Sequence, residues 1–196
     1  MLPIFVLTIA ELVLKEIEEM GERSFIPVIG TKKGKILDDA VKKAKPKLIL
    51  EVGTFIGYSA IRMVRVMPQG GRIITLEINK ASAEKAKKNI ERAGFSDKIQ
   101  IVVGDARKVI PNLNGVFDLV FLDAEKSEYL TYLKLVEGKL RKGSVIVADN
   151  AGVFAKEMAD YLSYVRTSGG YRSKYYESTL EFNDNIKDGV EVSVKL

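Results

Sequence analysis

The stretch "LVFLDAEKSEY", residues 119–129, changes from apolar to charged within a few positions. Its first half is typical of a buried strand, and Asp123 and Lys126 follow that strand directly. A second apolar run, "GSVIVADN" at residues 143–150, also ends in polar side chains, of which Asp149 is the first. Ligands bind beyond the carboxyl ends of the strands in open α/β sheets. The repeated chemistry therefore predicts a site built between these two strand ends.

Strand-like and helix-like segments alternate through the middle of the chain. The predicted strands lie at residues 46–53, 71–78, 97–105, 116–123 and 143–149, and the predicted helices at 57–67, 79–94 and 127–141. Such alternation predicts a parallel sheet with helices on both faces. The last two strands, "GYRSKYYES" and "GVEVSVKL", have only a short connection between them. They must therefore pair antiparallel and form a C-terminal hairpin.

The length of 196 residues and a hydrophobic content of 46% predict a single domain with one sizeable core. No apolar run reaches the ~18 residues of a membrane span, so we expect no membrane partner. The N-terminal stretch lacks the basic start and small-residue end of a signal peptide, and we expect a cytoplasmic protein. Apolar residues recur in that stretch at the spacing of an amphipathic helix, namely Ile9, Leu12, Val13, Ile17 and Met20.

The chain contains no cysteine and no histidine. Their absence excludes disulfides, a cysteine nucleophile, a Ser-His-Asp triad and a histidine-ligated zinc. Acid–base chemistry must therefore come from Asp, Glu, Lys or Tyr. A bound metal must accept oxygen ligands, which favours magnesium, calcium or manganese.

The net charge is +5, and much of the excess lies in "TKKGKILDDAVKKAKPK", residues 31–47, which holds seven lysines. The favoured interpretation is the solvated face of a helix. Nucleic-acid binding is the alternative, although no arginine or aromatic residue interleaves there to stack on bases.

Acids and glycines follow the first three predicted strands. "EVGTFIGYS" after the first strand is not the dinucleotide motif G-x-G-x-x-G, and Glu51 would repel a pyrophosphate but suit a cation. Gly53 would let a ligand approach the backbone, and Glu77 can accept bonds from both ribose hydroxyls. Asp105 is placed to meet an adenine edge, or else caps the next helix. Together they favour a positively charged nucleoside such as S-adenosylmethionine over NAD.

Four segments together resemble a known family: "ILEVGTFIGYSAIRM", "ITLEIN", "VFLDAEKSEYL" and "LRKGSVIVADN". They are similar to catechol O-methyltransferases, within the class I S-adenosylmethionine-dependent methyltransferases. The resemblance runs from about Phe25 to the C-terminus and includes "VIGTKKGKILD" and "LEFNDNIKDGVE". It implies a Rossmann-like α/β fold with a seven-stranded, mostly parallel sheet. One methyltransferase domain would span residues 1–196, with N-terminal helices at 1–45 covering the active site.

The resemblance also assigns roles residue by residue. Asp123, Asp149 and Asn150 match the family's magnesium ligands, Lys126 matches its catalytic lysine, and Glu181 matches the acid that holds the second substrate hydroxyl. Glu77 matches the ribose-binding acid, and the matches on the cofactor side extend to Ile29, Gly53 and Ser59. The whole predicted cofactor site consists of Ile29, Glu51, Gly53, Ser59, Glu77, Asp105, Ala106 and Asp123.

Physical chemistry agrees with these roles. Two adjacent carboxylates repel each other unless a divalent cation lies between them, and Asn150 adds a neutral oxygen. Such a cation would lower the pKa of a substrate hydroxyl, and Lys126 would take the proton. We expect the pKa of Lys126 to be lowered by the cation and by burial.

The chain also departs from the family. It has no tryptophan, whereas the catechol enzymes surround the substrate with tryptophan walls. Phe25, Glu125 and Phe154 stand at or near those positions, and Ala106 replaces a serine that touches the adenine. The substrate's identity therefore does not follow from the resemblance.

These observations predict a magnesium-dependent O-methyltransferase acting on a small molecule with vicinal hydroxyls, as a monomer or a homodimer. A methyltransferase for a hydroxylated tRNA nucleoside is the first alternative, because the lysine run would suit RNA. A cofactor-binding module without catalysis and an NAD oxidoreductase are weaker alternatives.

Overall fold

The computed structural model describes residues 7–196. Its helices are α1 (Ile9–Arg23), α2 (Gly30–Ala44), α3 (Tyr58–Val66), α4 (Lys80–Arg92), α5 (Ala106–Val109), α6 (Tyr129–Val136) and α7 (Ala159–Thr167), with short 3-10 turns at Ile110–Asn112, Lys126–Glu128 and Glu137–Lys139. Its strands are β1 (Leu48–Val52), β2 (Arg72–Glu77), β3 (Ile99–Val103), β4 (Phe117–Leu122), β5 (Leu140–Ala148), β6 (Tyr171–Leu180) and β7 (Asn183–Lys195).

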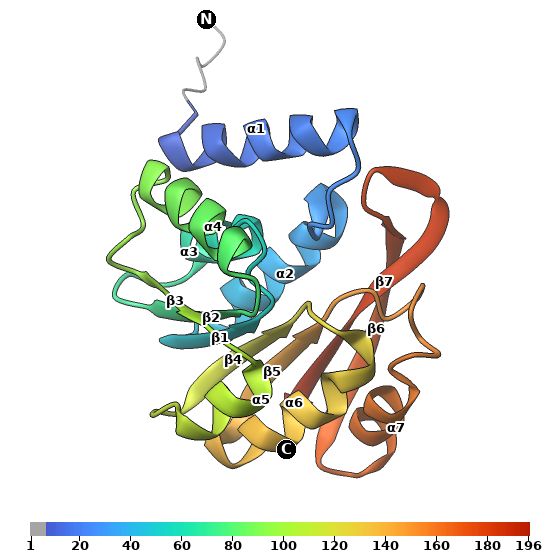
Figure 1. The fold of residues 1–196 in the computed structure, drawn as a ribbon. Coiled ribbons are helices and arrows are strands. Elements are labelled where there is room, and N and C mark those ends of the chain that lie inside the picture. The colour runs from blue at the N-terminus through green and yellow to red at the C-terminus, as the bar shows by residue number, and fades with distance from the viewer. Residues whose placement is uncertain (1–6) are drawn as a thin grey trace, which may run out of the picture.

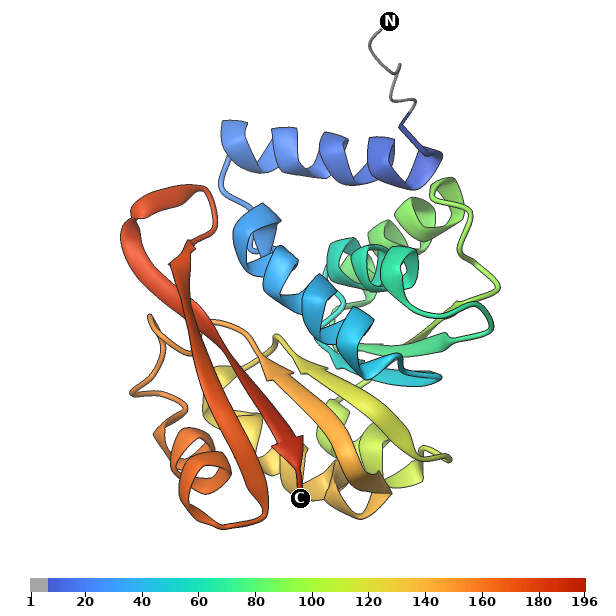
Figure 2. The same cartoon turned by 180° about the vertical axis from the view of Figure 1, so that it is seen from behind.

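The strands form one seven-stranded sheet in the order β3-β2-β1-β4-β5-β7-β6. Strands β1 to β5 pair parallel, whereas β7 pairs antiparallel with both β5 and β6. Helices α1 to α4 lie on one side of the sheet and α5 to α7 on the other (Figures 1 and 2). The predicted fold class is confirmed, including the C-terminal hairpin.

The core consists of two apolar layers, one on each face of the sheet. Along β4, Leu119 and Phe121 face the layer under α1 to α4, and Val120 and Leu122 face the layer over α5 to α7. A strand buried on both sides reads as an unbroken apolar run, which is why "LVFL" shows no alternation. The charged residues that follow this run therefore lie where the buried strand reaches the edge of the core.

The first helix forms where it was predicted, but its buried face differs in part. Thr8 and Glu11 make a capping box that fixes its start. Val13 and Ile17 are buried as expected, whereas Ile9 is 67% exposed. Leu12 and Met20 are also exposed, and Ala10, Leu14 and Gly21 complete the buried stripe instead. Residues 1–6 of the predicted 1–45 segment lie outside the described residues.

Two predictions near the C-terminus need correction, and one helix there was not predicted. The helix expected over 127–141 ends early, because β5 already begins at Leu140. Helix α7 was missed, although Tyr161, Leu162 and Val165 have helical spacing and are buried. Strands β6 and β7 extend further than predicted and meet in a turn at Glu181 and Phe182. Within residues 7–196, no helix is long and apolar enough to cross a membrane.

Candidate active site

Three neighbouring parallel strands, β1, β4 and β5, end at the same edge of the sheet. Backbone hydrogen bonds carry the ladder one step past the strands: Asp123 N–H donates to Val52 (2.9 Å) and Asp149 N–H donates to Leu122 (3.0 Å). Asp123 and Asp149 therefore occupy equivalent positions on adjacent strands. The charge of Asp123 also adds to the effect of burial in raising the pKa of Asp149. The structure thus brings together the two acids of the opening motifs.

Lys126 lies over the first of these acids. Its Nζ is 2.9 Å from Asp123 Oδ1 and donates to the Tyr129 hydroxyl at 2.9 Å. That hydroxyl in turn donates to the Leu122 carbonyl at 2.9 Å, so a buried phenol fixes the position of the ammonium. Sequence reasoning gave Tyr129 no role, although it follows Lys126 by three residues, one helical step.

The pKa of Lys126 differs from the sequence expectation. Burial lowers it, but the neighbouring Tyr129, Asp123 and Asp149 outweigh burial, so the pKa lies well above its usual value. The protein's own groups therefore favour the ammonium form. A cation that shared the negative charge of Asp123 would lower this pKa and favour proton acceptance by Lys126.

A second lysine, Lys33 in α2, lies at the other acid. Its side chain is 0% exposed, and Nζ donates to Asp149 Oδ2 at 3.0 Å and to Asp188 Oδ2 at 2.7 Å. Glu181 Oε2 lies 2.7 Å from the same Nζ, though without the geometry of a hydrogen bond. Burial lowers the pKa of Lys33, but the three carboxylates outweigh it and raise the pKa above the usual value.

The lysine run was interpreted as the solvated face of a helix, and for Lys33 this is wrong. The other six lysines of residues 31–47 are exposed. Lys33 is buried because it lies one and two turns before Leu37 and Val41, on the face of α2 that packs on the sheet. That spacing was a usable signal, which the density of lysines in the run concealed.

Asp188 is a further site residue that sequence reasoning missed. It is 0% exposed and accepts backbone N–H bonds from Gly152 (3.1 Å) and Val153 (3.0 Å). The Asn150 side chain also donates to it at 2.9 Å. That bond orients the Asn150 amide and leaves its carbonyl oxygen for another partner.

The predicted metal ligands suit a hard cation. Within residues 7–196, no group of three or more acids has the arrangement of a metal site, and the candidate set is two acids and one amide. Asp149 Oδ1 is buried without a hydrogen bond, although it lies 2.9 Å from Lys33 Nζ. Asp123, Asp149 and Asn150 offer only oxygen, which magnesium prefers. Both carboxylates are paired with lysines, so a divalent cation would share them with these ammonium groups.

The ends of β1 and β2 form the other half of the site. The Glu77 carboxylate accepts the backbone N–H of Phe55 at Oε2 (2.7 Å) and of Asn79 at Oε1 (2.8 Å), which fixes its orientation. Gly53 has φ +102, and a Cβ there would lie 2.1 Å from the Asp123 carbonyl oxygen. Only glycine therefore allows the end of β1 to pass this close to the end of β4.

Glu51 lies fully buried between the two halves. Ser59 Oγ donates to its Oε1, so two predicted cofactor residues touch each other. Its Oε2 has no hydrogen-bond partner among the described residues. Burial is the largest cause that raises the pKa of Glu51, to about 8. A cationic group placed at Oε2 would satisfy this carboxylate.

Asp105 caps helix α5 in the way the alternative interpretation expected. It accepts the backbone N–H of Arg107 at 2.9 Å, and the Arg107 guanidinium binds both of its oxygens. These bonds lower the pKa of Asp105 to about 2. Its neighbour Ala106 is buried in the layer over α5 to α7. A contact between these two residues and an adenine remains a prediction.

Comparison with known proteins decides the family. The family model described as O-methyltransferase matches residues 8–195. The chain belongs to the O-methyltransferase family. Catechol O-methyltransferase B of Danio rerio is 46% identical over 175 residues, which cover 86% of this chain and 65% of that protein. Catechol O-methyltransferase of Sus scrofa is 38% identical over 173 residues, covering 85% of this chain and 91% of that protein.

The O-methyltransferase from Bacillus cereus, solved in complex with SAH, has the same fold. Its TM-score is 0.82 at 24% identity, with 94% of this chain and 91% of that chain covered. The fold of this chain is therefore that of a solved O-methyltransferase.

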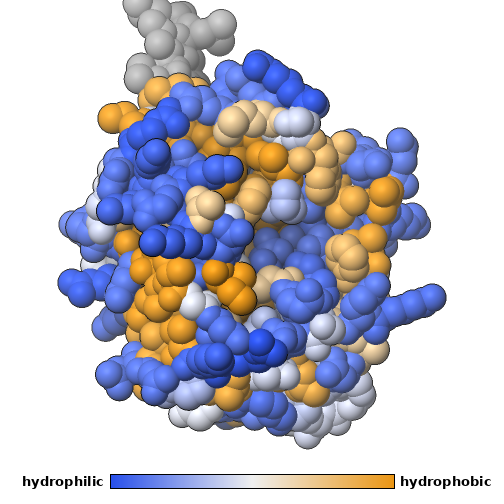
Figure 3. Space-filling view, viewed as in Figure 1, coloured by the Kyte–Doolittle hydropathy of each residue, from blue (hydrophilic) through white to orange (hydrophobic). Residues whose placement is uncertain are grey.

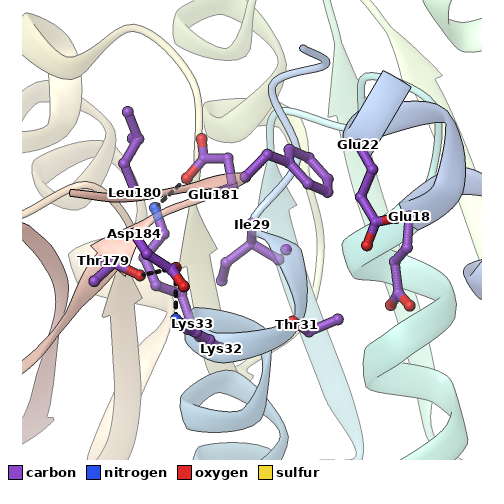
Figure 4. A pocket seen from close by; sticks show the side chains of 12 residues that line it. Glu18, Glu22, Ile29, Thr31, Lys32, Lys33, Thr179, Leu180, Glu181 and Asp184 are labelled. Carbon is purple, nitrogen blue, oxygen red and sulfur yellow. Dashed lines mark hydrogen bonds and ion pairs between the residues drawn. The ribbon is translucent and has the colours of Figure 1, made fainter. Parts of the chain in front are cut away.

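In this member of the O-methyltransferase family, a cavity of about 450 Å³ lies between α1, the first turn of α2 and the tip of the β6–β7 hairpin (Figure 4). Ile29 and Lys33 line it from the start of α2, Glu181 and Phe182 line it from the hairpin, and Glu18 lines it from α1. The molecule is hollowed beside the hairpin, and the hollow is mostly hydrophilic (Figure 3). Glu125 and Phe154, expected near the substrate, are not among the residues that line this cavity.

Proposed function

We propose that this protein transfers a methyl group from S-adenosylmethionine to one hydroxyl of a small substrate with two adjacent hydroxyls, with magnesium as the metal. The observation that carries the proposal is the convergence of Asp123, Asp149, Lys126 and Glu181 beside the glycine edge at Gly53. The names of the relatives support the substrate class, since two of them are catechol O-methyltransferases. The alignment covers 65% of the first of these, so activity and substrate are proposals for this chain.

The cofactor half would hold the nucleoside and the sulfonium. Glu77, already oriented by two backbone N–H groups, can accept from the ribose hydroxyls. Gly53 allows the methionine part to lie against the backbone, and Glu51 supplies a carboxylate oxygen without a partner for a positive group. Ser59 and Ile29 would complete the contacts on this side.

Asp123, Asp149 and Asn150 would hold magnesium, which supplies Lewis-acid polarisation of the substrate hydroxyls and fixes their orientation. Lys126 Nζ would accept the proton of the reacting hydroxyl, because Asp123 stabilises the ammonium less once its charge is shared with a cation. The cofactor would supply the methyl group: the substrate oxygen would gain the bond to the methyl carbon as the carbon–sulfur bond breaks, which would leave a neutral thioether. Glu181 would accept a hydrogen bond from the second hydroxyl.

The test compares catechol with phenol as the methyl acceptor, with magnesium and with EDTA. Catechol can offer two oxygens to one cation and phenol cannot. We expect catechol methylation to stop in EDTA and to return with magnesium, and phenol to react far more slowly. Equal rates on both substrates, or full activity in EDTA, would remove the chelation mechanism.

Methylation of a hydroxylated tRNA nucleoside is the second candidate. The six exposed lysines of residues 31–47 favour it, because phosphate binding depends on such charges. A tRNA-binding enzyme should show affinity that falls steeply with salt, by several powers of ten between about 50 and 200 mM. The segment at residues 1–45 would cover the small-molecule site under the first proposal and contact the RNA under the second.

A further inference from the structure

Two ion pairs connect the first turn of α2 to the tip of the β6–β7 hairpin. On the outside, Lys32 pairs with Asp184 at 2.5 Å, and both side chains are exposed. On the inside, Lys33 lies 2.7 Å from Glu181, and both side chains are buried. The two lysines and their partners are drawn together in Figure 4. Adjacent lysines thus make one contact in solvent and one within the site.

Of the three carboxylates around Lys33, one is held by other hydrogen bonds and two are not. Asp188 is held by the backbone N–H groups of Gly152 and Val153 and by the Asn150 amide, so its carboxylate cannot reorient freely. It anchors the Lys33 ammonium at 2.7 Å. An ammonium has three N–H donors, and carboxylates surround this one on three sides.

The other two carboxylates are held mainly by that ammonium. Asp149 Oδ1 and Glu181 Oε2 have no hydrogen bond among the described residues, and each lies within 2.9 Å of Lys33 Nζ. Asp149 extends from the end of β5, whereas Glu181 extends from the hairpin turn. Among the described residues, Lys33 is therefore the cation that holds these two like charges close together.

We propose that Lys33 is a positioning residue, which sets the separation between Asp149 and Glu181 and thereby the place of the two substrate hydroxyls. The inference rests on the proposed function, because Asp149 would be a metal ligand and Glu181 would bind the second hydroxyl. A purely structural ion cluster would be a weak explanation, since buried charge clusters often add little stability compared with apolar packing.

The experiment uses the full chain with Lys33→Met, Lys33→Arg and the matched control Lys32→Met. The control removes the neighbouring ammonium and its pair with the same hairpin, but it leaves the buried cluster intact. Lys33→Arg keeps the charge, but a planar guanidinium cannot reproduce the compact point charge that three carboxylates surround. Lys33→Arg also keeps the proposal testable if Lys33→Met does not fold.

The first measurement is amide hydrogen exchange of residues 176–188 in the protein without cofactor, metal or substrate. We expect exchange there to accelerate at least about tenfold in the Lys33 variants that fold, with no change in β1. Lys32→Met should remain within about twofold of the parent. Parental exchange in a folded Lys33 variant would overturn the proposal.

The second measurement separates substrate from cofactor. Lys33→Arg should raise the KM for catechol at least about tenfold and leave S-adenosylmethionine affinity, measured by calorimetry, within about twofold. An unchanged KM, or an equal loss of cofactor affinity, would also overturn the proposal. If the parent protein transfers no methyl group, the proposed function fails, while the exchange data still decide whether Lys33 holds the hairpin tip.

Discussion

The two halves of the candidate site are built in different ways. On the cofactor side, Glu77 is held by backbone N–H groups that lie 22 and 2 residues away in the chain. On the metal side, Lys33 reaches Asp149 and Asp188 across 116 and 155 residues, through side chains alone. The cofactor half is formed by strand ends and the turns that follow them. The metal half forms only after α2, β5 and the hairpin have packed together.

This difference predicts how each half responds to substitution of its residues. A carboxylate oriented by the backbone keeps its geometry when its neighbours change, because the turn itself supplies the donors. A cluster of side-chain charges depends on every member, since removing one partner leaves another charge buried and uncompensated. The variants below should therefore affect the two halves unequally, and they are ordered from the largest expected effect to the smallest.

Asp149→Ala should have the largest effect, because it removes a predicted metal ligand from the half made of side chains. Metal-assisted activation contributes several kcal/mol, so methyl transfer to catechol should fall by about 10³-fold or more. Magnesium affinity, followed by calorimetry, should fall with it. Asp39→Ala, an exposed acid on α2, is the control and should keep both values. Retained magnesium binding in Asp149→Ala would exclude this residue as a ligand.

Lys126→Ala should lower turnover by roughly 10²–10⁴, the usual range for a positioned general base. Cofactor affinity should change little, because the Lys126 ammonium bonds to Asp123 and Tyr129 and not to Glu77 or Glu51. Steady-state kinetics and cofactor titration measure the two quantities. Lys134→Ala, an exposed lysine on α6, is the control. Parental turnover would mean that Lys126 only pairs with Asp123.

Gly53→Ala tests the edge where the two halves meet. A Cβ would lie 2.1 Å from the Asp123 carbonyl oxygen in a backbone with φ +102, so unfolding free energy should fall by roughly 2–5 kcal/mol. Gly70→Ala is the matched control, because Gly70 has φ +83 and open space around it. It should cost only about 1–2 kcal/mol of backbone strain. Equal losses in thermal or urea unfolding would show that the close approach is unimportant.

Glu77→Ala should weaken S-adenosylmethionine binding by about 1.5–3 kcal/mol, the value of a hydrogen bond to a charged group. Magnesium affinity should stay unchanged. Glu77→Ala would thus affect only the cofactor half, whereas Asp149→Ala would affect the metal half. Calorimetry measures both, with the exposed Glu84→Ala as the control. Parental cofactor affinity would place the ribose elsewhere.

The last comparison concerns pH and Glu51. Its pKa is about 8 in the folded protein, against an ordinary value of 4.5, chiefly because of burial. Between these values the unfolded chain binds fewer protons at Glu51 than the folded chain, so Glu51 lowers stability as pH rises from about 4.5 to 8. Glu51→Gln should flatten this part of the stability curve, because a glutamine does not titrate, as measured by urea unfolding of the cofactor-free protein. An unchanged slope would show that Glu51 does not titrate in this range.

The sequence by itself determined most of the fold and half of the site. Unbroken apolar runs ending in charges located β4 and β5, and the short C-terminal connection required an antiparallel hairpin. Asp123 and Asp149 became neighbours because parallel strands end at a common edge. These features follow from the local pattern of apolar residues and from the general geometry of parallel sheets, so the sequence is enough to predict them.

The tertiary structure alone decided the partners of the charged groups. Lys33 looked like one of seven similar lysines, yet packing of α2 buries it among three carboxylates from β5 and the hairpin. Packing also places Asp188 within that cluster. It buries Lys126 with Tyr129 and brings β5 with Asp149 to the same place, and Tyr129, Asp123 and Asp149 raise the pKa of Lys126 where the sequence suggested a lower one. The physical reason is that the energy of a charge depends on its burial and on its nearest opposite charges. Neither is fixed until segments far apart in the sequence have packed together.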